Sequence, residues 1–138
     1  MKKALFLLLL IPLLMSCEER ADTTWSVVNV TVPANDWTAH VNNDGSNLFY
    51  YCSLDMPEIT PYVAQYGNVA IYVVDGNVQY PLPSNRHMEI ISLLNPRQWT
   101  RTVEFEYQPG QINIFVTDSD FESGHAPGNM SFRIVTTW

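Results

Sequence analysis

Residues 99–107 read Trp-Thr-Arg-Thr-Val-Glu-Phe-Glu-Tyr, and residues 108–117 continue as Gln-Pro-Gly-Gln-Ile-Asn-Ile-Phe-Val-Thr. In the first stretch, large side chains alternate with threonine and glutamate, which is the period of a strand with one buried face and one face in water. Pro109 and Gly110 suit the central positions of a type II turn, so residues 112–117 are expected to pair with the preceding strand. This hairpin predicts an antiparallel, all-β fold.

Short runs of β-branched and aromatic residues, separated by Pro, Gly, Asn and Asp, recur along the rest of the chain. Asp75-Gly76-Asn77 is the clearest signal for a tight hairpin between two of them. About seven to eight antiparallel strands and no long helix predict a single β-sandwich of the Ig-like or Greek-key type, with a small closed barrel as the alternative. Besides the two strands of the opening hairpin, the predicted strands are residues 25–32, 48–56 in the centre of a sheet, 68–74, 78–82, 88–94 and 130–136, with residues 37–41 as a short edge piece.

One segment departs from the strand pattern. Thr60 suits the N-cap of a helix and Pro61 its first turn, so residues 61–66 are expected to form a short helical crossover. Gly67 is expected to end it with a left-handed backbone conformation.

The first seventeen residues have the three regions of a bacterial lipoprotein signal. Two lysines come first, residues 4–14 form an apolar run too short to span a bilayer, and Ser16 precedes Cys17. An ordinary secretory signal is the alternative, but Leu14 stands where such a signal needs a small residue. We therefore expect residues 1–16 to be removed as a signal peptide, and Cys17 to carry diacylglyceryl and palmitate chains that attach the protein to a membrane.

The rest of the chain divides into a short tether and one domain. Residues 17–24 hold three acids and one arginine, which predicts a solvated acidic tether before a β-sandwich domain at residues 25–138. Loss of residues 1–16 removes both lysines and leaves five arginines against fourteen acidic residues, a formal charge of −9. This charge argues against nucleic acid as a partner. With Cys17 lipidated, Cys52 has no disulfide partner.

Several segments are similar to those of known proteins: Trp37, residues 49–51, 57–60, 67–73 and 80–83, Tyr107, Gly110, Ile112, Ile114 and residues 131–135. They resemble a family of small Bacteroidetes lipoproteins of unknown function that have a β-sandwich domain. The resemblance implies the fold and a cell-envelope location, and it carries over no catalytic residue. The acids directly after Cys17 also resemble the export signal of surface-exposed lipoproteins at the outer membrane.

The sequence offers few groups for chemistry. Asp118, Asp120 and Glu122 place acids at alternating positions of a loop, which suits calcium, although the glycine and final glutamate of an EF-hand are missing. A solvated acidic loop is the simpler interpretation, so no cofactor is expected. The three histidines at positions 40, 87 and 125 share no metal-ligand spacing. Cys52 lies among large apolar neighbours and is expected to be buried rather than reactive.

Three functional classes remain open from the sequence. The preferred one is a lipid-anchored binding or interaction module of the cell envelope that is accessory to glycan capture, with Trp37, Tyr66, Tyr72 and Trp99, together with Trp138, as candidate stacking residues. The same aromatic residues in an all-β domain also suit the core and cross-strand pairs. The second class is a structural subunit of an envelope assembly that pairs through a strand edge. The third and least favoured is a hydrolytic enzyme built from Asp55, Glu58, Glu104 and Glu106.

Overall fold

The structure is a computed structural model that describes residues 23–41, 43, 49–121 and 126–138. The predicted signal peptide, Cys17 and most of the tether lie outside the described residues. In the described ranges the chain forms nine strands, all paired antiparallel, with one 3-10 turn and one short α-helix.

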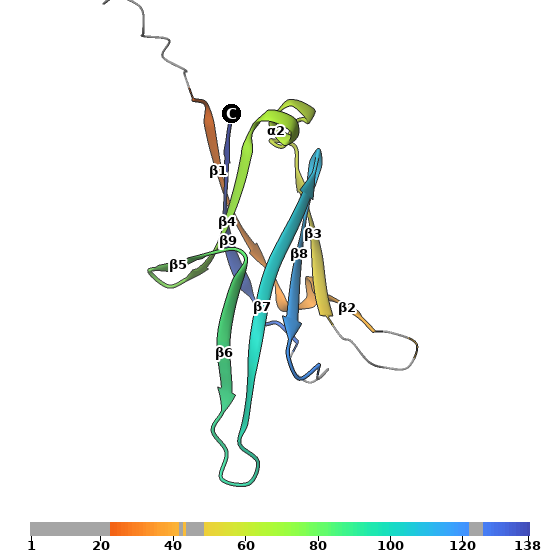
Figure 1. The fold of residues 1–138 in the computed structure, drawn as a ribbon, viewed down its shortest axis with the longest axis vertical. Helices are drawn as coiled ribbons and strands as arrows, with labels where there is room; N and C mark the ends of the chain where they lie inside the picture. The colour runs from red at the N-terminus through yellow and green to blue at the C-terminus, as the bar shows by residue number, and fades with distance from the viewer. Residues whose placement is uncertain (1–22, 42, 44–48, 122–125) are drawn as a thin grey trace, which may run out of the picture.

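The strands form two sheets that face each other, so the predicted antiparallel β-sandwich is confirmed (Figure 1). The four-stranded sheet has the order β1 (Trp25–Val32), β9 (Met130–Thr137), β4 (Asn68–Asp75) and β5 (Val78–Pro81). The five-stranded sheet has the order β2 (Thr38–His40), β3 (Phe49–Met56), β8 (Gly110–Asp118), β7 (Arg97–Gln108) and β6 (Ser84–Ile90). The 3-10 turn η2 (Ala34–Asp36) lies between β1 and β2.

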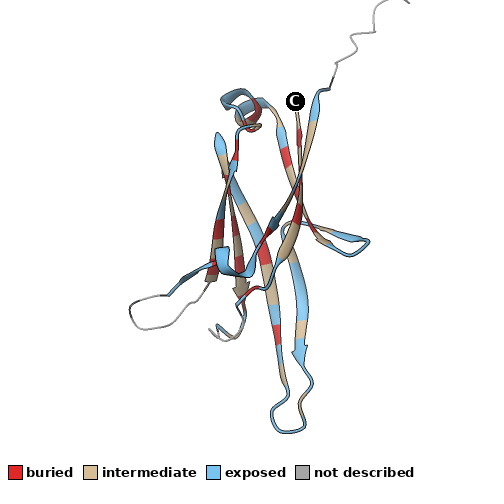
Figure 2. Cartoon of the chain, turned by 180° about the vertical axis from the view of Figure 1, so that it is seen from behind, coloured by how far each residue is buried: buried red, intermediate tan, exposed pale blue. Residues whose placement is uncertain are grey.

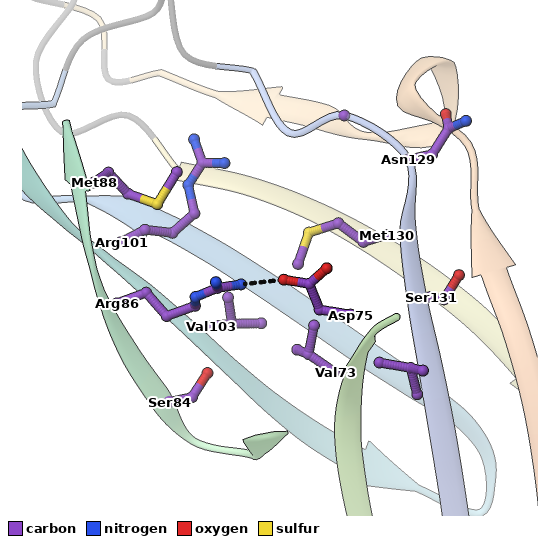
Figure 3. Close-up of a pocket in the computed structure, with 12 residues that line it drawn as sticks. Val73, Asp75, Ser84, Arg86, Met88, Arg101, Val103, Asn129, Met130 and Ser131 are labelled. Atoms are coloured by element: carbon purple, nitrogen blue, oxygen red, sulfur yellow. Dashed lines mark hydrogen bonds and ion pairs between the residues drawn. The ribbon is translucent and has the colours of Figure 1, made fainter. Parts of the chain in front are cut away.

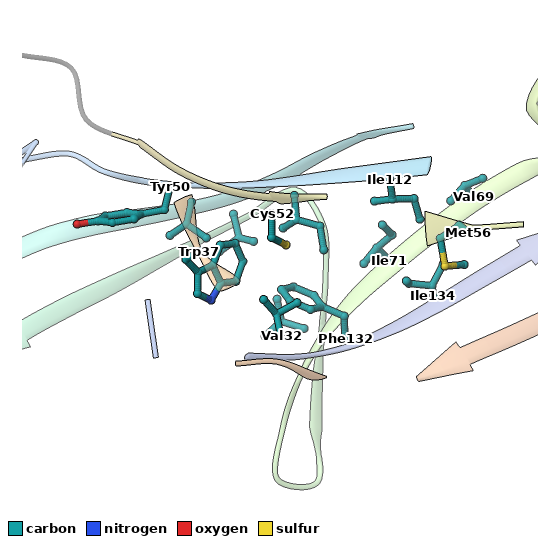
Figure 4. Packing of buried hydrophobic residues seen from close by; sticks show 14 of the residues in the cluster. Val32, Trp37, Tyr50, Cys52, Met56, Val69, Ile71, Ile112, Phe132 and Ile134 are labelled. Carbon is teal, nitrogen blue, oxygen red and sulfur yellow. The ribbon is translucent and has the colours of Figure 1, made fainter. Parts of the chain in front are cut away.

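The core lies between the sheets and follows the alternation of the strands (Figure 4). Figure 2 shows buried residues alternating with more exposed ones along the strands, as expected where one face of each sheet is covered. The whole apolar cluster comes from residues between Val32 and Ile134, so the segment from Thr23 to Trp138 contains both sheets and the core that holds them together. Its central members are Cys52, Ile71, Ile112, Ile114, Val116, Phe132 and Ile134.

Both predicted hairpin turns are confirmed. Gln108 pairs with Gln111 across Pro109 and Gly110, and Gly110 has a φ of +81°. Asp75 pairs with Val78 across a two-residue loop in which Gly76 has a φ of +59°. Glycine adopts these angles without the steric cost that a Cβ atom would bring.

The short helix α2 (Pro61–Tyr66) also forms as predicted, because the Thr60 hydroxyl accepts a hydrogen bond from the Val63 amide at 3.2 Å. The expected left-handed glycine at its end is wrong, since Gly67 has a φ of −91° and an extended backbone. Gly67 is needed for a different reason. A Cβ at this position would lie 2.6 Å from the carbonyl oxygen of Thr137 and 2.7 Å from that of Val63.

The strand predicted at residues 88–94 is shifted toward the N-terminus and shares only residues 88–90 with the observed strand. The β6 strand begins at Ser84 and ends at Ile90, because its register with β7 starts at the pair Ser84–Val103 and ends at the pair Ile90–Arg97. Residues 91–96 form the tip of the β6–β7 hairpin, which extends past the rest of the sandwich (Figure 1). Their aliphatic side chains are fully exposed there, with relative exposures of 88% at Ile91, 105% at Leu93 and 97% at Leu94.

The strand predicted at the centre of a sheet, β3, pairs with a neighbouring strand along both of its edges for only part of its length. β3 pairs with β8 along its whole length, but β2 pairs only with residues 49–51 of it. None of the described helices is long and apolar enough to cross a membrane.

Candidate functional site

The structure separates the aromatic residues proposed as a stacking platform. Trp37 and Trp99 are buried, with 8% and 7% exposure, and the Trp37 indole donates a hydrogen bond to the Gly128 carbonyl at 3.2 Å. Tyr66 is exposed on α2, whereas Tyr72 is half-buried on the outer face of the four-stranded sheet. These four side chains do not form one surface, and the two tryptophans belong to the interior.

The acidic loop is also arranged differently from the sequence-based expectation. Asp118 is the last residue of β8, is 5% exposed, and faces Arg101 across the sheet. The Arg101 Nε and Nη2 atoms donate to its two carboxylate oxygens at 2.8 and 2.7 Å. Asp120 is half-buried, and Glu122 lies outside the described residues. Among the described residues, no group of three His, Cys, Asp or Glu side chains is placed to hold a metal ion.

The other reactive candidates are scattered. Asp55, Glu104 and Glu106 are exposed on strands of the five-stranded sheet, and Glu58 is half-buried in the turn before α2. Burial raises the pKa of the Cys52 thiol from 9.0 to about 11, although a backbone hydrogen bond at Ile114 opposes the shift. The thiol is therefore protonated at neutral pH and suits a core position, as the sequence predicts. His125 lies outside the described residues.

A cleft of about 290 Å³ opens between the two sheets, beside the β6–β7 hairpin (Figure 3). Arg86 reaches from β6 across this cleft to Asp75 at the end of β4, with 3.2 Å between Nη1 and Oδ2, and its guanidinium lies 4.7 Å from the centre of the Tyr80 ring. The Ser84 hydroxyl is buried at the cleft and has no hydrogen-bond partner among the described residues. The apolar lining consists of Val73, Val74, Met88, Val103 and Met130.

Arg101 also lines this cleft, next to its partner Asp118. Burial is the main cause of a raised pKa at Tyr50 in the neighbouring core, the negative charge of Asp118 adds to it, and the positive charge of Arg101 opposes it. The charged groups of the cleft are thus engaged with each other. The cleft lies between the two sheets, and the Ser84 hydroxyl is the group that remains for a small ligand.

A second hollow lies on the outer face of the five-stranded sheet, over β2, β3, β8 and β7. It is an open depression of about 390 Å³, which we call the outer depression. Four aromatic rings form one side of it. His40 stacks on Phe49 at 4.6 Å between ring centres, and Phe115 meets the edge of Phe49 at 5.9 Å. Tyr51 lies 6.4 Å from Phe49.

Polar side chains form the other side of the outer depression. The Ser53 hydroxyl donates to the Asn113 side-chain oxygen at 2.7 Å, and the Asn113 amide donates to Glu106 at 3.0 Å. The strand register causes this row, because Ser53 and Glu106 both lie opposite Asn113 on neighbouring strands. Gln111 completes the lining. The depression thus combines aromatic faces with hydroxyl, amide and carboxylate groups.

Sequence reasoning missed this surface, although a signal was present. Phe49, Tyr51 and Ser53 alternate with the buried Tyr50 and Cys52, so β3 has aromatic side chains on both of its faces. Polar side chains are sufficient on a strand face that meets water. The large aromatic side chains on the outer face of β3 therefore indicate a surface with a further role.

No protein-family model matches the chain, and none of the curated proteins or solved structures compared with it matches it either. The functional proposal therefore depends on the geometry of the chain itself.

Proposed function

We propose that the chain is a lipid-anchored binding module of the cell envelope that holds a sugar chain in the outer depression. The proposal rests on one observation: the aromatic rings around Phe49 and the hydrogen-bonded row Ser53–Asn113–Glu106 lie next to each other on one sheet face. Aromatic faces pack against the C–H faces of sugar rings, while placed polar groups fix orientation by hydrogen bonds to hydroxyls.

The charge of the surface indicates which sugars it suits. Glu106 lines the outer depression, Glu104 lies beside it, and His40 is the one basic side chain in its lining. Carboxylates accept hydrogen bonds from sugar hydroxyls but repel anionic groups at close range. We therefore expect neutral glycans to bind and uronic-acid or sulfated glycans to be disfavoured.

The proposed location rests on the N-terminal sequence. Residues 1–17 have the regions of a lipoprotein signal, and the acidic tether and the resemblance to Bacteroidetes lipoproteins favour the outer membrane. Lipid on Cys17 would hold the module at the membrane, since two acyl chains or more are needed for stable anchoring. Intact mass of the membrane-extracted protein tests this step: acylation of Cys17 with loss of residues 1–16 supports it, and an unmodified Cys17 contradicts it.

Glycan binding is tested by affinity electrophoresis of the segment 23–138 in gels that contain neutral polysaccharides. The variant His40→Ala/Glu106→Gln alters the outer depression, and we expect it to lose at least tenfold in affinity. The matched control is His87→Ala/Glu89→Gln, because these exposed residues lie on β6, at the opposite edge of the same sheet. The proposal would be contradicted if the two variants were retarded to the same extent. It would also be contradicted if no polysaccharide retarded the unmodified segment.

A second candidate function follows from β1. It is an edge strand of eight residues without a charged side chain, and β9 is its one neighbour in the described part of the chain. Edges of this kind can accept a strand from another protein, since charges and prolines usually block such pairing. A structural subunit that works by strand addition would form stable hetero-oligomers, and Val27→Lys on β1 would dissociate them. Retention of the complexes by that variant would exclude this edge.

A further inference from the structure

One end of the sandwich exposes a group of aromatic side chains. Trp25 begins β1, Trp138 follows β9, and Tyr62 and Tyr66 lie on α2, with relative exposures of 68%, 36%, 60% and 66%. Tyr107, with 39% exposure, lies in β7 close to the turn at Pro109 and Gly110. Figure 1 shows α2, the start of β1 and the end of the chain together at this end, opposite the β6–β7 tip.

Backbone and ring contacts hold these elements together. Thr24 and Trp138 exchange two backbone hydrogen bonds of 2.8 and 2.9 Å, which hold the start of β1 beside the end of β9. Trp25 pairs with Thr137, so the side chains of Trp25 and Trp138 lie at the same end but on opposite faces of the sheet. Gly67 follows α2 and packs against the backbone of Thr137. The Tyr62 and Tyr66 rings lie 5.1 Å apart on successive turns. We call this group of Trp25, Tyr62, Tyr66, Tyr107 and Trp138 the aromatic end.

Most of the segments that form the aromatic end lack charged side chains, although the chain as a whole is acidic. Residues 23–28, 59–74 and 134–138 contain none. The acids beside these segments are Asp22 before Thr23, Asp55 and Glu58 before α2, and Glu106 next to Tyr107. Tryptophan and tyrosine are the side chains that settle at the boundary between lipid headgroups and acyl chains, because each has an apolar ring and a polar atom. An acidic face would instead be repelled by anionic lipid.

We propose that the aromatic end rests in the headgroup region of the bilayer that holds the lipid of Cys17. This inference rests on the proposed lipid anchor. The described chain begins with Thr23 at this end, and the eight residue-to-residue steps from Cys17 to Trp25 span at most about 29 Å. The domain then stands with its long axis away from the membrane. The aliphatic tip of Ile91, Leu93 and Leu94 points outward.

The full-length protein, extracted in detergent and reconstituted into phosphatidylcholine vesicles, tests the proposal by tryptophan fluorescence. Phospholipid brominated on its acyl chains should quench Trp25 and Trp138 and leave the buried Trp37 and Trp99 unaffected. The quenchable emission should therefore be lost in Trp25→Phe/Trp138→Phe. Adding Leu93→Trp to that double variant places a reporter at the opposite tip, and we expect its emission to remain unquenched.

The outcomes separate this inference from the anchor on which it rests. Protein that does not enter the vesicles contradicts the lipid anchor and with it the proposed orientation. Protein that is anchored but shows no quenching of Trp25 and Trp138 contradicts the aromatic end alone. Quenching of the reporter at position 93 would mean that the aliphatic tip meets the membrane. A response of Trp25 and Trp138 to neutral polysaccharide in place of vesicles would make this end a sugar site, and would also overturn the inference.

Discussion

Arg101 and Asp118 lie directly opposite each other on β7 and β8, and the guanidinium of Arg101 donates a hydrogen bond to each carboxylate oxygen of Asp118, at 2.8 and 2.7 Å. Both side chains are largely buried, with 14% and 5% exposure. The arrangement gives Asp118 a structural partner at the edge of the core. It also uses the two oxygens that a cation in the following loop would need.

The first prediction concerns the stability that depends on this pair. Asp118→Asn leaves the Arg101 charge poorly compensated at a buried position, so we expect it to lower the free energy of unfolding by about 3 kcal/mol or more. The control is Asp75→Asn, which breaks the exposed ion pair with Arg86 and should cost less than about 1 kcal/mol. Urea denaturation of both variants measures the difference. If the two variants lost similar amounts of unfolding free energy, burial would not determine the contribution of the Arg101–Asp118 pair to stability.

The second prediction concerns calcium. Because Arg101 occupies the Asp118 carboxylate, we expect millimolar calcium to leave the melting temperature of metal-free protein unchanged. Differential scanning fluorimetry with and without a chelator measures this. A rise in melting temperature that Asp120→Asn abolishes would instead establish a calcium site in the acidic loop.

The third prediction concerns Gly67. Gly67→Ala places a methyl group against two carbonyl oxygens that belong to the backbone and have little room to move. We expect a loss of about 1–3 kcal/mol or more in stability. Gly128→Ala is the matched control, since a Cβ at that position meets nothing within 4 Å. Thermal unfolding that is equally affected by both substitutions would contradict the close approach of α2 to β9.

The fourth prediction is a loss of stability at alkaline pH. The Cys52 thiol has a pKa of about 11 in the folded chain and an ordinary value of 9.0 when unfolded. Above pH 9 the unfolded chain loses this proton while the folded chain retains it, so stability falls between about pH 9 and 11. By pH 10 the loss from this group is about 1 kcal/mol.

The variant Cys52→Ala isolates this contribution. It is expected to be less stable at neutral pH because it leaves a small cavity, but its stability should fall less steeply between pH 9 and 10.5. Burial also raises the pKa of Tyr50, so this residue contributes to the fall in stability with pH in both proteins. Identical slopes in urea titrations would mean that the thiol is not protected from ionisation.

The strands were largely predictable because each has a regular alternation and a turn with defined chemistry. Pro109-Gly110 and Asp75-Gly76-Asn77 set the hairpins, and Thr60-Pro61 sets the helix start, through local interactions alone. The error at residues 88–94 arose because the run of Ile91, Leu93 and Leu94 has strand-forming composition, whereas pairing with β7 ends at Ile90. Strand pairing is a long-range interaction that composition does not encode.

The candidate site was less predictable for a related reason. Trp99 lies on the inner face of β7 and Trp37 lies between η2 and β2, whereas Phe49 and Tyr51 lie on the outer face of β3. Only the packing of the two sheets decides which of these aromatic side chains are covered. In the row of Ser53, Asn113 and Glu106, the last two face each other across the β7–β8 hairpin, whereas Ser53 comes from β3, 60 residues before Asn113. The pairing of β3 with β8 is not encoded in any local pattern.

Residue-level mapping of glycan binding is the sharpest test of whether the outer depression binds a sugar chain. The segment 23–138, labelled with ¹⁵N, is titrated with the neutral glycan retained in affinity electrophoresis while amide shifts are followed by NMR. If the outer depression is the sugar site, the largest changes cluster there, around Phe49, Ser53, Glu106 and Asn113. Changes confined to the cleft around Val73, Arg86 and Met130, or to the aromatic end, would contradict it.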